Sequence, residues 1–104
     1  MDKAFTNHKY NGVLLKFPNG ATISTIWGPG SYSEHHDDEF EGYSTLNKNG
    51  SMTAEIMILE APQRVVKRIF KRLAPDSQDT VIGWVTITDW LWVINQLAKA
   101  EGGN

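Results

Sequence analysis

The chain has 104 residues, a length that suits a single domain (1–104) with a modest hydrophobic core. Hydrophobic residues make up 40% and charged residues 21% of the sequence, which excludes general disorder. The absence of cysteine excludes disulfide bonds and thiolate metal sites, and the net charge of -2 does not favour a general polyanion-binding protein.

The N-terminal residues MDKAFTNHKY are polar and show neither a strand nor a helix pattern. They lack the apolar core of a signal peptide, and no apolar run approaches the roughly 20 residues that cross a bilayer. We therefore expect a protein that acts in the cytoplasm without a membrane partner.

A β-hairpin is predicted next. Residues 12–18 and Ala21–Trp27 flank Asn19-Gly20, and both of these residues tolerate the positive φ that two-residue hairpin turns require. Alternation of apolar and polar side chains over Ala21–Trp27 indicates a strand with one apolar face, which the glycine-rich turn 28–30 then ends.

Residues 31–48 show no sustained period and predict a loop, with a short strand at Gly42–Leu46 as a further element. Residues 51–60 then alternate regularly: Met52, Ala54, Ile56 and Ile58 share one face. This segment is the clearest strand pattern in the chain.

The period changes over Pro62–Leu73, where Val65, Ile69 and Leu73 belong to an apolar stripe at helical spacing. A helix is predicted, and an irregular strand stays open as the alternative because Val and Phe favour strands. Residues 79–85 predict another strand.

The last predicted element is a helix that begins after Thr86. Thr86 suits the N-cap position and Asp89 follows three residues later, as in a capping box. Gly102-Gly103 is predicted to end the helix. Together the elements predict an α+β fold: a small, mostly antiparallel β-sheet with one or two helices packed on it and a C-terminal helix.

The segment Glu34–Glu39 crowds two histidines among carboxylates, but adjacent residues do not converge on one ion. Neither H-x-H nor H-x-x-x-H spacing occurs, so we expect no metal, no cofactor and no catalytic residues. A hydrolase that uses His35, His36 and Asp37 is kept as a third class of function. Calcium-loop, phosphate-loop and nucleophile motifs are also missing from the sequence.

The same segment is instead predicted to bind a partner protein, because it combines carboxylates with aromatic side chains on a loop. The predicted contact residues are Tyr32, Glu34, Asp37, Asp38, Glu39, Phe40, Glu41 and Tyr43.

A second candidate surface is the polar face of the 62–73 helix, which carries Arg64, Lys67, Arg68, Lys71 and Arg72. A nucleic-acid-binding module built on these cations is an alternative function. Direct nucleic-acid contact is not expected, because the pI is near 5.8 and no aromatic residue is interleaved on that face. The acidic loop would also repel a duplex unless it lay on the far side of the domain.

Four tryptophans occur in the chain. Trp27, Trp84 and Trp90 are predicted in the core. Trp92 lies in an apolar run that encircles the start of the last helix, so a core position and an interface position stay equally open. An interface at Trp92 would serve a homodimer or another partner.

The stretch 17–33 reads F-x-N-G-x-T-I-S-x-x-W-G-x-G-x-Y-S, and T-A-E-I (53–56) and D-T-V-x-G-W-x-T (79–86) follow. This pattern resembles small uncharacterised proteins of tailed bacteriophages. The resemblance implies a phage accessory protein in the bacterial cytoplasm. For such a protein we expect a non-enzymatic inhibitor of a host protein or complex, of the anti-CRISPR or another anti-defence type. The expected target is basic or handles nucleic acid, and a small-ligand or nucleotide sponge is the alternative.

Overall fold

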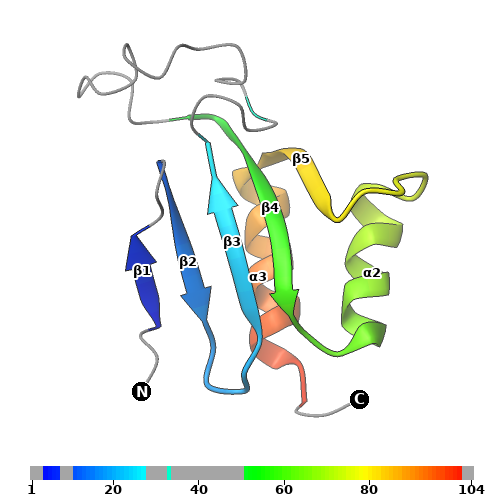
Figure 1. Ribbon diagram of the computed structural model, residues 1–104. Coiled ribbons are helices and arrows are strands. Elements are labelled where there is room, and N and C mark those ends of the chain that lie inside the picture. Colours follow the sequence, from blue (N-terminus) through cyan, green and yellow to red (C-terminus); the bar gives the residue numbers. More distant parts are fainter. Residues whose placement is uncertain (1–3, 8–10, 28–32, 34–50, 102–104) are drawn as a thin grey trace.

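The computed structural model describes residues 4–7, 11–27, 33 and 51–101. Five strands and two helices occur in these ranges: β1 (Phe5–Asn7), β2 (Gly12–Lys16), β3 (Thr22–Ile26), β4 (Thr53–Glu60), α2 (Gln63–Leu73), β5 (Val81–Thr86) and α3 (Ile87–Lys99). The strands lie in the order β1-β2-β3-β4-β5, and every neighbouring pair is antiparallel. The predicted α+β class is confirmed (Figure 1).

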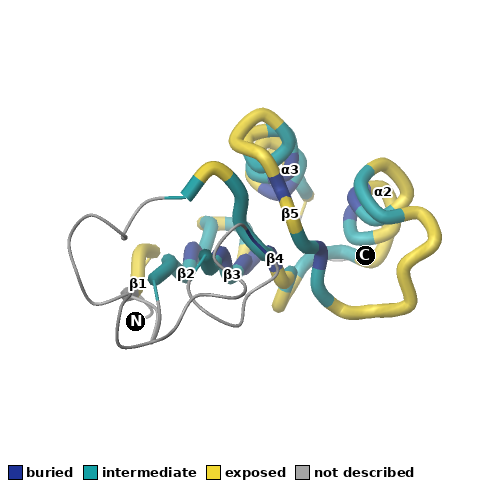
Figure 2. Tube along the Cα trace, turned by 90° about the horizontal axis from the view of Figure 1, so that it is seen from above, coloured by how far each residue is buried: buried dark blue, intermediate teal, exposed yellow. Residues whose placement is uncertain are grey.

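Both helices lie on one side of the sheet, as Figure 2 shows. Apolar residues of strands and helices meet between these layers and form the core, which consists of Leu15, Ala21, Ile23, Ile56, Val65, Ile69, Ile82, Val85, Val93 and Leu97. In both views β1 and β2 extend beyond the helices, so part of the inner sheet face has no helix above it (Figures 1 and 2). That uncovered part forms one wall of the candidate site.

The predicted hairpin of β2 and β3 is confirmed, with a longer turn than expected. The N–H of Phe17 donates to the Ala21 carbonyl at 2.8 Å, and the N–H of Gly20 donates to the Phe17 carbonyl at 2.9 Å. Gly20 has a φ of 93°, which glycine adopts without steric penalty. The turn therefore uses three residues, 18–20, in place of a two-residue Asn-Gly turn.

The predicted strand 51–60 is confirmed as β4, and β5 pairs with it through a bulge. Val85 is opposite Ala54 and Ile82 is opposite Ile56, so the two residues between Ile82 and Val85 face one residue of β4. Such a bulge lets Ile82 and Val85 both point into the core.

The prediction that Trp84 belongs to the core is wrong, because Trp84 is 56% exposed. It is one of the two residues in the bulge and has a φ of 55°, the left-handed region. Bulky side chains rarely adopt this conformation because the Cβ atom crowds the following carbonyl. The extra residue of the bulge thus turns outward and stores backbone strain.

We expect Trp84→Gly to be more stable than Trp84→Ala by about 1 kcal/mol, because only glycine relieves the positive φ. Elsewhere in a strand the order of these two residues is the reverse. Urea denaturation of both variants, followed by circular dichroism, measures the difference. If the alanine variant is the more stable, Trp84 does not occupy the left-handed region.

The segment 62–73 forms a helix, which removes the strand alternative, and Pro62 is its N-cap residue. For α3 the predicted N-cap is confirmed: Thr86 Oγ1 accepts a hydrogen bond from the N–H of Asp89 at 3.3 Å. The helix ends at Lys99, before the glycines that were predicted to stop it.

Asn19 provides the reason for this earlier end. Its Nδ2 donates to the carbonyl of Leu97 at 2.9 Å and to that of Ala100 at 2.7 Å. These carbonyls belong to the C-terminal turn, where helical partners run out.

Strand β1 was not predicted, because three residues of mixed polarity carry too little pattern. Phe5–Asn7 pair with Val13–Leu15 at the sheet edge. The predicted strand at Gly42–Leu46 lies outside the described residues.

Candidate functional site

The predicted partner-binding residues Tyr32 to Tyr43 lie outside the described residues, as do His35 and His36. The structure does describe where the chain enters and leaves this part of the sequence. Trp27 follows β3, and Ser51 stands two residues before β4. Between them, Ser33 is buried, and its hydroxyl donates to the Trp27 carbonyl at 3.3 Å.

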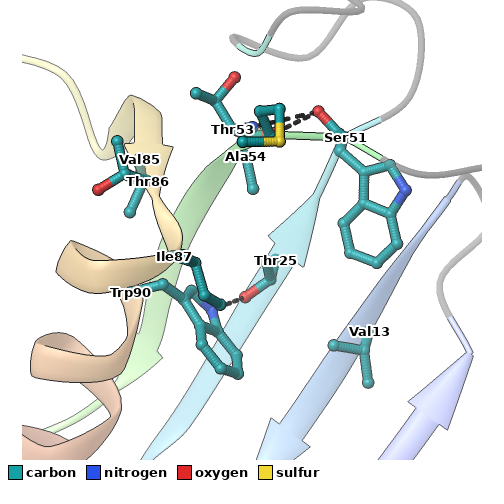
Figure 3. Close-up of a pocket in the computed structure, with 11 residues that line it drawn as sticks. Val13, Thr25, Ser51, Thr53, Ala54, Val85, Thr86, Ile87 and Trp90 are labelled. Carbon is teal, nitrogen blue, oxygen red and sulfur yellow. Dashed lines mark hydrogen bonds between the residues drawn. The ribbon is translucent and has the colours of Figure 1, made fainter.

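Trp27 and Ser51 both line a cleft of about 370 Å³ that opens between the uncovered inner face of the sheet and the start of α3 (Figure 3). We call it the apolar cleft, since it contains no charged side chain. It is lined by Val13, Thr25, Trp27, Ser51, Met52, Thr53, Ala54, Val85, Thr86, Ile87 and Trp90. Pockets of this size and lining bind apolar groups.

Trp90 shapes the cleft. It stands in the first turn of α3, and its indole Nε1 donates a hydrogen bond to Thr25 Oγ1 in β3 at 2.9 Å (Figure 3). The bond satisfies the polar atoms of both side chains and fixes the ring against the sheet. Trp27 and Trp90 are half-buried, so the core prediction holds only in part for them.

Large apolar side chains stand at the rim of the cleft. Met52 is 77% exposed and Ile87 is 62% exposed. Leu91 follows Ile87 by one helical turn and is also exposed. Apolar side chains that gather beside an apolar cleft are typical of a binding surface. The sequence pattern placed Met52 in the strand, on one face with Ala54 and Ile56, but β4 begins only after it.

A buried polar atom lies at the same end of the sheet. Asn11 Nδ2 is inaccessible to solvent and has no hydrogen-bond partner in the described part of the chain. The Asn11 carbonyl accepts from the N–H of Trp27 at 2.9 Å, which places Asn11 next to a cleft residue. A buried amide without a hydrogen-bond partner lowers the free energy of unfolding, so Asn11 destabilises this end of the sheet.

The five cations predicted on α2 are all exposed. Arg68 Nη1 donates to Gln96 Oε1 in α3 at 3.0 Å. The Arg72 guanidinium lies 4.6 Å from the centre of the Trp92 ring, a cation–π distance. Trp92 is half-buried: it packs against the core on one side and is covered by Arg72 on the other. This is intermediate between the core position and the interface position that the sequence left open. An interface at Trp92 stays a prediction.

A second cleft of about 370 Å³ lies between the first half of α2 and the last turns of α3. We call it the basic cleft. Its lining residues are Arg64, Val65, Arg68, Gln96, Lys99, Ala100 and Glu101. The charge pattern of the 62–73 segment predicted the two arginines. Lys99 and Gln96 were missed, because only the packing of α3 on α2 brings them to this site.

Within the described ranges, no group of three or more His, Cys, Asp or Glu residues is placed to hold a metal ion. No helix among these residues is long and apolar enough to cross a membrane. The predicted absence of a metal site at His35 and His36 concerns residues outside these ranges and stays a prediction.

The fold and its sites define an α+β domain with an apolar cleft at one end and a basic cleft between its helices. Comparison with known proteins finds no matching family model, no similar curated protein and no matching solved structure.

Proposed function

We propose that this chain is a non-catalytic binding protein of a tailed bacteriophage that inhibits a host protein or complex, of the anti-CRISPR or another anti-defence type. The observation that supports the proposal best is the apolar cleft with its exposed rim of Met52 and Ile87. Protein interfaces are typically held by a few apolar side chains that one partner buries in a pocket of the other. A cleft with exposed apolar residues at its rim can receive such a side chain.

The cleft also lies where the predicted contact segment begins and ends, since Trp27 and Ser51 line it. A partner that inserts an apolar side chain into the cleft contacts the two ends of the predicted contact segment, Trp27 and Ser51. The carboxylates in the sequence of that segment favour a basic partner surface, such as that of a host protein that handles nucleic acid. Charge complementarity of this kind acts mainly on the association rate and weakens with salt.

A small-ligand sponge is the second candidate, and the volume of the apolar cleft supports it. About 370 Å³ lies at the lower end of the range for small-molecule sites. The cleft has no Lys or Arg side chain to bind a phosphate, so the ligand would be an apolar molecule and not a nucleotide.

The test begins with a pull-down of the tagged protein from the bacterial host and mass spectrometry, followed by calorimetry with the purified host factor. We expect the double variant Met52→Asp, Ile87→Asp to bind at least about tenfold more weakly, because it places charges where an apolar contact is buried. Replacement of Asp37, Asp38 and Glu39 by serine is expected to weaken binding and to flatten its salt dependence.

The matched control is Leu59→Asp, which changes an exposed apolar residue of β4 outside the cleft and is expected to bind like the parent. Equal binding by the parent and the rim variant would contradict the proposed surface. A small apolar molecule that copurifies and is displaced by the rim substitutions would favour the sponge.

A further inference from the structure

The basic cleft has no role in the proposed function, and it lies at the opposite end of the sheet from the apolar cleft. Strand β4 starts near the apolar cleft and leads to α2, whose first turns line the basic cleft (Figure 1). The eight residues of β4 span about 26 Å. We propose that the basic cleft and the exposed face of α2 bind the phosphate backbone of duplex nucleic acid, independently of base sequence.

The cations of this surface keep their charge available. Among the described residues, no carboxylate pairs with Arg64, Lys67, Lys71 or Lys99. Arg68 is held by the neutral amide of Gln96, which orients the guanidinium without cancelling its charge. One acidic residue, Glu101, also lines the cleft. The surface thus has a clear excess of positive charge.

The surroundings of these cations add to the excess. No acidic residue stands in the first turn of α2, and no side chain caps that helix end, whose N–H groups carry partial positive charge. The cations from Arg64 to Arg72 extend over about 12 Å along the helix. A surface of this length contacts several successive charges, which a polyanion supplies.

The composition of the surface favours nucleic acid over a protein partner. All exposed residues of α2 are basic, apart from Gln63. Protein interfaces need an apolar or aromatic anchor at their centre and contain few lysines. Phosphate binding needs no such anchor, since its free energy comes from counterion release.

A duplex is favoured over a single strand, because single strands stack their bases on exposed aromatic side chains. Of the aromatic residues beside this face, Phe70 packs against the core, and the Arg72 guanidinium covers the ring of Trp92. Phosphates therefore provide the available contacts.

Both ends of the acidic segment lie far from this surface. The chain enters and leaves that segment at Trp27 and Ser51, both at the apolar cleft. The length of β4, about 26 Å, is three times the screening length of about 8 Å at physiological salt. The sequence analysis allowed duplex binding only if the acidic loop lay on the far side of the domain. Both ends of that loop do lie at the far end of the sheet from the basic cleft.

The experiment measures fluorescence anisotropy of a labelled random duplex of about 20 base pairs with the full chain, at about 50 and about 200 mM salt. With three to four phosphates contacted, we expect affinity to fall about 40- to 150-fold between these salt concentrations. The triple variant Arg64→Gln, Arg68→Gln, Lys99→Gln is expected to bind at least about tenfold more weakly at low salt. Its logarithmic salt slope should be lower by about three.

Two controls separate this surface from net charge. Lys9→Gln, Lys16→Gln, Lys48→Gln removes three cations that belong to neither helix in the sequence and should change affinity less than about twofold. Gln96→Glu places a carboxylate beside the Arg68 guanidinium and should weaken binding, whereas Asn95→Asp adds the same charge on a neighbouring position of α3 and should not. Thermal melts verify that each variant is folded.

The proposal is overturned if the parent shows no binding at low salt, or if both triple variants lose the same affinity. It is also overturned if polyglutamate competes as well as unlabelled duplex, which indicates an acidic protein as partner. Equally effective competition by a mononucleotide at the same phosphate concentration indicates a small-ligand site instead. None of these results depends on the rim variants of the apolar cleft, so this inference and the proposed function fail separately.

Discussion

Replacement of Leu97 by alanine is expected to lower the free energy of unfolding by roughly 2–5 kcal/mol. Leu97 is 0% exposed in the last turns of α3 and belongs to the core between the helices and the sheet. Truncation removes buried apolar contacts and leaves a cavity that the packed surroundings fill only in part. In a domain of about 100 residues each kcal/mol lowers Tm by about 4–8 °C, so the loss is easily measured.

Leu91→Ala is the matched control, since it makes the same chemical change in the same helix. Leu91 is 56% exposed, and we expect its truncation to change stability by no more than about 0.5 kcal/mol. Urea denaturation followed by circular dichroism gives both values. A similar loss for the two variants would contradict the packing of α3 on the sheet, because the wrong face of the helix would then be buried.

Features that depend on neighbouring residues were predicted well from the sequence. Alternation of side chains identified β4, helical spacing identified α2, and the Thr86 to Asp89 spacing identified the cap of α3. In each case the residues that interact are at most a few positions apart. Their side-chain preferences therefore act in the same way in any fold.

The bulge at Trp84 could not be predicted from neighbouring residues. Its segment reads as a regular strand, and only the pairing of Val85 with Ala54 and of Ile82 with Ile56 forces an extra residue out of the ladder. That requirement comes from the partner strand, which lies some 30 positions earlier in the sequence. Gly83, beside Trp84, was the only local signal of a bulge.

The two clefts were missed for the same reason. The walls of the apolar cleft come from four strands and α3, and Trp90 meets Thr25 across 65 positions of the chain. The predicted basic face became a cleft only because α3 brings Lys99 and Gln96 to it. Tertiary packing creates these sites, and a local sequence pattern does not predict which distant residues meet.

Replacement of Asn19 is expected to be the most costly change at the hairpin turn. Its Nδ2 donates to the carbonyls of Leu97 and Ala100, and its Oδ1 accepts from the N–H of Ala21 at 2.9 Å. Asn19→Ala removes all three bonds and takes these partners from the Ala100 carbonyl and the Ala21 N–H, while the Leu97 carbonyl keeps the N–H of Ala100. The expected cost is roughly 2–3 kcal/mol. The turn and the end of α3 would then separate more easily.

Asn19→Asp tests which of the three bonds matter, because a carboxylate accepts but does not donate. It keeps the bond from Ala21 and faces two carbonyl oxygens at the negative end of the helix dipole. At pH 7 the aspartate variant should therefore be no more stable than the alanine variant. The carbonyl surroundings raise the pKa of the introduced carboxyl in the folded protein above its unfolded value.

The stability of the aspartate variant relative to the alanine variant should consequently rise as pH falls. This gain is fully present below the unfolded pKa, where the protonated carboxyl donates to one carbonyl, and it is lost as pH rises through the folded pKa. Urea denaturation of both variants at several pH values gives the difference between their free energies of unfolding. The contributions of all other titrating groups are the same in both variants and cancel in this difference. A difference that does not change with pH would contradict the assignment of Asn19 as the donor that caps α3.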